Sequence, residues 1–132
     1  MYNYVQIDLV TGKADGISVL ASEVVADNLI AIDTYDDRLL MCYYIDGKFE
    51  GYYTKLQYDS INKKVVAEIF TYLDERALDY NADIIFDYEG NQIIVQAVNG
   101  IATIDFVADA GTTHTVRTVN PTFRNSEVTF SV

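Results

Sequence analysis

The stretch Ile93–Val107, IIVQAVNGIATIDFV, carries the clearest folding signal of the chain. Asn99-Gly100 suits a two-residue type I′ turn, because both residues tolerate the positive φ that this turn requires. A hairpin closed there pairs Val98 with Ile101 and Ile93 with Phe106. Since side chains alternate along a strand, the hairpin has one wholly apolar face and one polar face. The apolar face consists of Ile93, Val95, Ala97, Ala102, Ile104 and Phe106, and the polar residues are Gln96, Thr103 and Asp105.

The composition agrees with a fold built from such strands. Half of the 132 residues are hydrophobic, and eleven tyrosines and six phenylalanines accompany a single proline. Aromatic and β-branched runs broken by Asp-Gly and Asn-Gly are typical of strands joined by tight turns. We therefore predict an all-β protein, with a small antiparallel sheet in region 1–56 and a β-sandwich in region 61–132.

The charge excludes some partners. Twenty acidic and nine basic residues leave a net charge of −11, which repels nucleic-acid phosphates and anionic lipid. The N-terminal stretch MYNYVQIDLV has neither a basic region nor a cleavage site, so we expect no signal peptide and folding in a cytoplasm. No apolar run approaches the length that crosses a bilayer.

Two further hairpins are expected in the first half. The strand Tyr2–Val10 alternates, and Ile17–Leu20 returns after a glycine-rich loop; a short strand, Leu29–Asp33, follows. Leu39–Thr54 folds at Asp46-Gly47. That fold pairs Tyr44 with Phe49, Cys42 with Gly51, Leu40 with Tyr53, and Tyr43 with Glu50.

Segment 63–78 admits two interpretations. Ile61, Val65, Ile69 and Leu73 fit the stripe of an amphipathic helix, whereas the β-branched and aromatic residues of 65–72 favour a strand. We choose the strand. The remaining strands expected are Ile84–Tyr88, Thr113–Val119 and Glu127–Val132, with a break at Asn120-Pro121.

The cysteine, histidine and aspartate residues give little indication of a catalytic site. Cys42 is the only cysteine and sits in an apolar run, so we expect a small core residue and no disulfide. His114 is the only histidine, and one His with one Cys is too few for zinc. Asp33, Asp36 and Asp37 are the candidate calcium ligands, but they lack the spacing and glycine of a helix-loop-helix calcium loop. We expect no enzyme activity, no cofactor and no metal.

Binding is better supported, by tyrosines outside the expected core. Tyrosine beside carboxylates suits saccharide recognition and protein interfaces. The alternative is that these rings fill cross-strand positions of the two sheets. The candidate binding residues are Tyr43, Tyr52, Tyr58, Tyr72 and Tyr88.

Residues 63–132 resemble a bacterial immunoglobulin-like domain of the invasin type. The resemblance is carried by the strand Lys64–Tyr72, the turn at Asp74-Glu75, the strands at Ile84-Ile85-Phe86 and Gly100–Ile104, and the Ala110-Gly111-Thr112 turn before Thr115-Val116-Arg117. Arg76-Ala77-Leu78 replaces the usual Gly-x-Pro turn, and His114 stands near the usual tyrosine. The resemblance implies an immunoglobulin-like sandwich.

The first half is similar to the N-terminal region of small tail-associated proteins of bacteriophages and prophages. The similar segments are Met1–Gly12, Asp27–Asp33 and Asp46–Tyr52. The two resemblances together imply a non-enzymatic virion accessory protein, made in the host cytoplasm, with other tail or virion proteins and a host-surface saccharide as partners and with homo-oligomers permitted. The alternatives are an intracellular phage protein that binds a host or assembly factor, and a glycan-processing enzyme that uses Asp36 or Asp37.

Overall fold

The computed structural model describes all residues, 1–132, and is built from strands with one short 3₁₀ helix. The predicted all-β fold class is confirmed. The chain forms two compact units, Met1–Gly51 and Tyr52–Val132, which are described separately below. No helix has the length and the apolar character needed to cross a membrane.

A three-stranded antiparallel sheet forms the first part of unit 1. The strand β1 (Tyr2–Ile7) lies between β2 (Ala14–Leu20) and β3 (Leu29–Ile32), so the first predicted hairpin is confirmed. Val5 pairs with Ile17 on one side and Ile30 on the other, and its side chain is fully buried. The register slips after Gln6, where β1 meets the glycine-rich loop.

The 3₁₀ helix η1 (Asp37–Met41) and a two-stranded ribbon complete unit 1. The ribbon joins β4 (Tyr43–Ile45) to β5 (Lys48–Glu50), with Tyr44 opposite Phe49 and Tyr43 opposite Glu50 as predicted. The predicted pairing of Leu40 with Tyr53 is wrong, because Leu40 lies in η1. Asp36 diverts the chain there, since its carboxylate accepts the Arg38 N–H and begins the helix.

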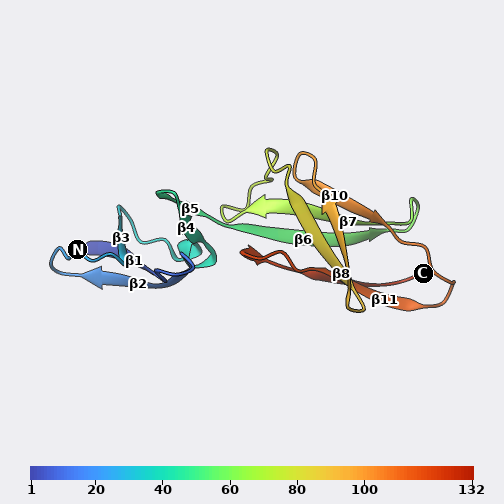
Figure 1. The fold of residues 1–132 in the computed structure, drawn as a ribbon, viewed down its shortest axis with the longest axis horizontal. Coiled ribbons are helices and arrows are strands. Elements are labelled where there is room, and N and C mark those ends of the chain that lie inside the picture. The colour runs from blue at the N-terminus through green and yellow to red at the C-terminus, as the bar shows by residue number, and fades with distance from the viewer. The chain divides into compact units, whose positions relative to one another are not determined.

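Unit 2 is a sandwich of two four-stranded sheets (Figure 1). Its first sheet has the order β10-β7-β6-β12 and its second β13-β11-β8-β9. The first contains β6 (Tyr52–Asp59), β7 (Lys64–Thr71), β10 (Ile101–Asp105) and β12 (Phe123–Arg124). The second contains β8 (Asp83–Tyr88), β9 (Asn91–Gln96), β11 (Thr113–Thr118) and β13 (Glu127–Ser131). The strand chosen for 63–78 is confirmed by β7.

One apolar core joins the two sheets. Val65 and Ile69 of β7 pack with Ile84 and Phe86 of β8 and with Val116 of β11, all with no exposed surface. A buried polar link lies beside this core, because the hydroxyls of Thr54 on β6 and Thr118 on β11 are 2.7 Å apart. The Ser126 hydroxyl donates to the Thr54 carbonyl oxygen at 2.7 Å and so shields that link. Satisfied in this way, the hydroxyls can be buried without a large desolvation cost.

The stretch around Asn99-Gly100 makes the predicted turn but not the predicted hairpin. Both residues have positive φ, 51° and 75°, and Val98 pairs with Ile101. Beyond that bridge the two strands separate, since β9 pairs with β8 and β10 pairs with β7. The turn therefore carries the chain from one sheet of the sandwich to the other.

Most residues of the predicted apolar face are buried or packed against the core, although the strands pair differently from the prediction. Ala97, Ala102, Ile104 and Phe106 are buried, and Val95 packs against the core. Ile93 differs, because it is 41% exposed at the sheet edge. Side-chain alternation was thus predicted correctly, whereas strand pairing was not.

The first strand of unit 2 begins directly after the ribbon of unit 1. Tyr52–Asp59 forms one continuous strand that pairs with β7 over its full length. The predicted limits, 1–56 and 61–132, fall within and after that strand. The break at Asn120-Pro121 is present, and Asn120 fixes it by accepting the Ile85 N–H and donating to the Asp83 carbonyl oxygen.

Gly100 is the position at which this fold tolerates a side chain least. A Cβ there would lie 2.4 Å from the Ala77 carbonyl oxygen, whereas a Cβ at Gly90 would meet nothing within 4 Å. Gly90 has the same place in its own turn and a similar φ, 84°. We expect Gly90→Ala to lower the free energy of unfolding by about 1 kcal/mol from backbone strain alone. Gly100→Ala should cost about 3 kcal/mol, because the clash adds to that strain.

Chemical denaturation of both variants measures this difference. Equal losses at the two glycines would show that the close approach at Gly100 contributes nothing to stability.

Candidate functional site

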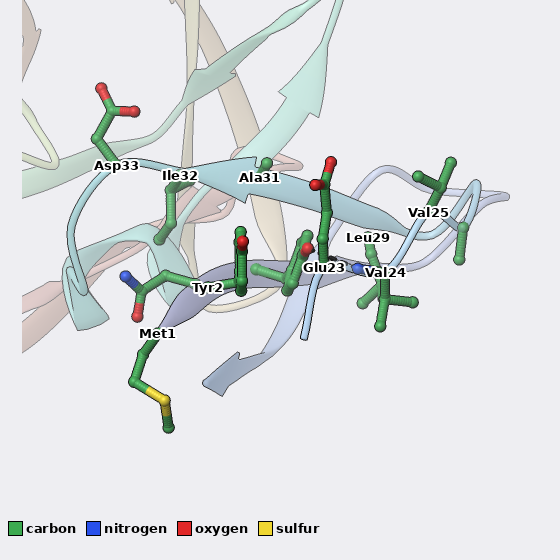
Figure 2. A pocket seen from close by; sticks show the side chains of 12 residues that line it. Met1, Tyr2, Glu23, Val24, Val25, Leu29, Ala31, Ile32 and Asp33 are labelled. Atoms are coloured by element: carbon green, nitrogen blue, oxygen red, sulfur yellow. Dashed lines mark hydrogen bonds between the residues drawn. The ribbon is translucent and has the colours of Figure 1, made fainter. Parts of the chain in front are cut away.

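A pocket of about 510 Å³ opens on unit 1 beside β1 and β3 (Figure 2). One wall is the start of the chain through β1, the second is β3 with Asp33, and the third is the segment Glu23–Ala26 that follows β2. Figure 2 shows Val24 and Val25 on this last segment and Leu29 and Ala31 on β3, and all four residues line the pocket. The lining therefore combines apolar side chains with polar atoms in comparable shares, beside a strand edge.

The third wall is held by a single buried tyrosine. Tyr4 points from β1 into unit 1 with only 3% of its surface exposed, and its hydroxyl accepts the Val24 N–H at 2.8 Å. The Leu29 N–H donates to the Ala26 carbonyl oxygen and turns the chain back into β3. Val25, between these two fixed points, is 93% exposed. An apolar side chain is thus presented to solvent by backbone that is tied down on both sides.

The charges around this pocket have one sign. Glu23 and Asp33 carry carboxylates into its lining, and no lysine or arginine side chain is part of it. Unit 1 as a whole has nine acidic and three basic side chains. A pocket that offers both apolar side chains and carboxylates is complementary to a segment that combines apolar and basic residues.

The candidate tyrosines lie in separate places. Tyr58 and Tyr88 belong to one aromatic cluster of unit 2, around Phe106. Tyr58 stacks on Phe130 with ring centroids 4.0 Å apart, and its buried hydroxyl has no hydrogen-bond partner. Tyr88 meets Phe106 edge to face at 5.0 Å. These two rings act as packing residues between strands, in line with the filler interpretation.

His114 belongs to the same cluster and closes a hydrogen-bonded chain. The Thr112 hydroxyl donates to the Asp109 carbonyl oxygen at 2.6 Å, so it accepts from His114 Nε2 at 2.7 Å. The other ring nitrogen, Nδ1, lies 2.6 Å from the Tyr88 hydroxyl oxygen and completes the chain. Both ring nitrogens of the only histidine are occupied by this structural role.

The other three candidates lie elsewhere. Tyr52 stacks on Phe123 and meets the Tyr80 ring edge to face, at 5.3 and 5.2 Å. Tyr43 lies in the ribbon of unit 1, with the Lys13 ammonium 5.7 Å from its ring centroid. Tyr72 follows the end of β7 and is half-buried. The structure therefore does not gather the five tyrosines into one surface, and their role in binding stays a prediction.

An aromatic and cationic cluster on β6 and β7 was not predicted. Tyr53 and Phe70 are cross-strand partners, and their rings stack at 5.3 Å. The Lys55 ammonium lies 4.5 Å from the Phe70 centroid, and the Arg76 guanidinium lies 5.6 Å from it. The Tyr53 hydroxyl donates to Asp74 at 2.6 Å, and this bond raises the pKa of Tyr53. Pairing 52–59 with 64–71 across a tight turn would have revealed this contact from the sequence.

A second, polar pocket of about 370 Å³ lies on β11 of unit 2. Carboxylates of Asp87 and Glu89, the hydroxyls of Thr113 and Thr115, and the Arg117 guanidinium line it. Arg117 Nε is 3.6 Å from Asp87 Oδ1, and its side chain is more than half exposed. Donors and acceptors of this kind match the hydroxyls of a polyol or saccharide.

The candidate metal ligands Asp33, Asp36 and Asp37 have separate places: Asp36 caps η1, Asp37 is its first residue, and Asp33 lines the pocket of unit 1. Asp36 binds the Arg38 guanidinium through both carboxylate oxygens, at 2.9 Å each, and this contact lowers the pKa of Asp36. Hydrogen bonds from its own turn likewise lower the pKa of Asp8. No group of three or more His, Cys, Asp or Glu residues comes together in a geometry that could hold a metal ion.

The fold and these sites define an all-β protein with a β-sandwich unit and two surface pockets. Comparison with protein-family models, with curated proteins and with solved structures finds no match.

Cys42 offers a direct test of the packing of unit 1. Its side chain is fully buried, and burial raises the pKa of the thiol from 9.0 to about 11. The thiolate is the reactive form, so we expect no alkylation by iodoacetamide at pH 8 until unit 1 unfolds. Because the unfolded thiol ionises first, the free energy of unfolding should fall as the pH rises from 9 to 11. Cys42→Ala should remove that component of the pH dependence, and rapid alkylation of the folded protein would contradict the burial.

Proposed function

We propose that this chain is a non-enzymatic structural or accessory protein of a phage virion, associated with the tail or baseplate. In this proposal unit 1 docks on another virion protein, and unit 2 is an immunoglobulin-like module displayed for weak adhesion to a host-surface saccharide. The observation that carries the proposal is the pocket of unit 1, whose lining combines exposed apolar side chains with two carboxylates and no cation.

The docking part rests on the chemistry of that pocket. Val25 is exposed on backbone that is fixed on both sides, which suits contact with a partner at little entropic cost. The Glu23 and Asp33 carboxylates favour a partner segment that carries lysine or arginine beside apolar residues. The proposed occupant of the pocket is such a segment of a neighbouring virion protein.

The strand order of unit 2 supports the immunoglobulin-like assignment. Apart from the two-residue β12, seven strands form two antiparallel sheets in which β6, β7 and β10 oppose β8, β9, β11 and β13. The connections from β7 to β8 and from β9 to β10 both cross between sheets. Such crossings are typical of the Greek-key sandwiches to which immunoglobulin domains belong.

The docking surface is tested by reversing its charge. Glu23→Lys and Asp33→Lys should each reduce incorporation into particles several-fold, as measured by quantitative mass spectrometry of purified virions. Asp15→Lys is the matched control, because Asp15 is exposed on β2 of the same unit and does not line the pocket. Equal loss with all three substitutions would mean that the pocket is not the docking surface.

Complete absence of the wild-type chain from purified particles would overturn the virion assignment itself. Co-purification with a host or assembly factor from infected-cell lysate would then favour the intracellular alternative.

The adhesive part is tested at the polar pocket of unit 2. Arg117→Ala removes its exposed cationic donor and should lower retention of the protein on host cells or on their surface polysaccharide several-fold. Lys64→Ala is the control, because Lys64 is likewise a partly exposed cation that pairs with a carboxylate, that of Asp105, outside this pocket. Equal retention of the wild type and both variants would remove the pocket as the adhesive site, and turnover of the polysaccharide would favour the enzyme alternative.

A further inference from the structure

The strand β9 is an unprotected sheet edge. It pairs with β8 on one side and ends the second sheet of unit 2 on the other. Its six residues, NQIIVQ, include no charged side chain, and Ile94 is 62% exposed. The other sheet edges are shorter or carry a charged residue, such as Asp15 on β2, Asp105 on β10 and Glu127 on β13. Proteins normally block exposed edges with charges, so an edge without them is suited to pairing.

The register of β8 with β9 shows which backbone groups are unpaired. The two strands close at Glu89-Gly90, where both residues have positive φ, and Tyr88 faces Asn91. In a two-residue hairpin the closing pair exchanges hydrogen bonds, and every second residue does the same. The Ala97 N–H, bonded to the Ala82 carbonyl oxygen at 2.9 Å, continues this alternation. The N–H and C=O groups of Gln92, Ile94 and Gln96 therefore point away from β8.

The sequence of this edge is complementary to itself. In an antiparallel pair centred on Ile94, Gln92 faces Gln96 of the second copy, Ile93 faces Val95, and Ile94 faces Ile94. Amide side chains meet amides and aliphatic side chains meet aliphatic ones. The same register places the three outward-facing residues in hydrogen-bonded pairs.

The net charge of the chain favours a second copy as the partner at this edge. Each chain carries a net charge of −11, so two copies repel one another over most of their surface. The residues from Gly90 to Ile104 form the longest uncharged run of the sequence. A basic partner would gain nothing from an uncharged strand and would be attracted to the acidic surfaces instead. At β9 a like-charged copy meets no opposed charge over six residues, whereas the uncharged edge β3 is four residues long.

We propose that β9 is a dimerisation edge at which two copies of the chain join by antiparallel β9–β9 pairing about a two-fold axis at Ile94. The pairing extends the second sheet of unit 2 across both copies. Because the contact uses the same strand from each copy, it closes at two and leaves no β9 edge free. The proposal does not depend on a virion location or on the pocket of unit 1.

Sedimentation velocity over a range of protein concentrations tests the proposal. The wild type should show a reversible monomer–dimer equilibrium, and added salt should strengthen it by screening the repulsion between the copies. Ile94→Lys sets two lysines opposite each other at the axis and should raise the dissociation constant by about tenfold or more. Val107→Lys adds the same charge at an apolar residue that is 82% exposed and lies outside β9, and it should leave the dimer intact.

A second variant and a residue-level measurement guard against indirect effects. Gln92→Lys should weaken the dimer as Ile94→Lys does, and circular dichroism should show both variants folded. In the wild type, amide hydrogen exchange should slow with rising concentration at Ile94 and Gln96, but not at Ile93. A wild type that stays monomeric at all concentrations would overturn the proposal. So would equal weakening by the β9 and Val107 substitutions, or dimerisation weakened by salt.

Discussion

The sandwich depends on one close backbone approach, at Gly100. Its carbonyl oxygen accepts the Ile69 N–H at 2.9 Å, and its own N–H donates to the Tyr80 carbonyl oxygen at 2.9 Å. Ala77 in turn donates to the Ile69 carbonyl oxygen. The chain leaving β7, the chain entering β8 and the β9–β10 turn are thus hydrogen-bonded at one point. Only a residue without a Cβ fits there. The chain can therefore cross between the sheets at this point because residue 100 is glycine.

This constraint explains how far the fold could be predicted from the sequence. Alternation along a strand depends on local geometry, and it correctly placed Ala97, Ala102 and Ile104 in the core. The Asn99-Gly100 turn was also found, because positive φ is a local demand. Which strands pair, however, depends on tertiary contacts. Nothing local to Ile93–Val107 indicates that β7 competes successfully for β10, or that β12 adds to β6 in parallel.

The sites were harder to predict than the strands, for a related reason. Tyr58 and Tyr88 were placed on faces outside the core, yet both pack around Phe106, because the edges of a small sandwich are closed by large rings. The pocket of unit 1 needs Tyr4 to reach Val24, twenty residues away in the sequence, and no pattern encodes that contact. Tyr53 and Phe70 were accessible in principle, since their contact follows from the register of one hairpin.

Both units place acidic residues in turns, and the sequence has one long uncharged run. Some acidic side chains have a structural role in turns, where Asp8, Asp36 and Asp59 accept hydrogen bonds from nearby groups. A chain so acidic keeps its copies apart except where charge is missing. The uncharged run through β9 coincides with the exposed edge, although a lysine at Ile94 would face solvent and disturb no core contact. An uncharged strand at this exposed edge is what the proposed β9–β9 pairing requires.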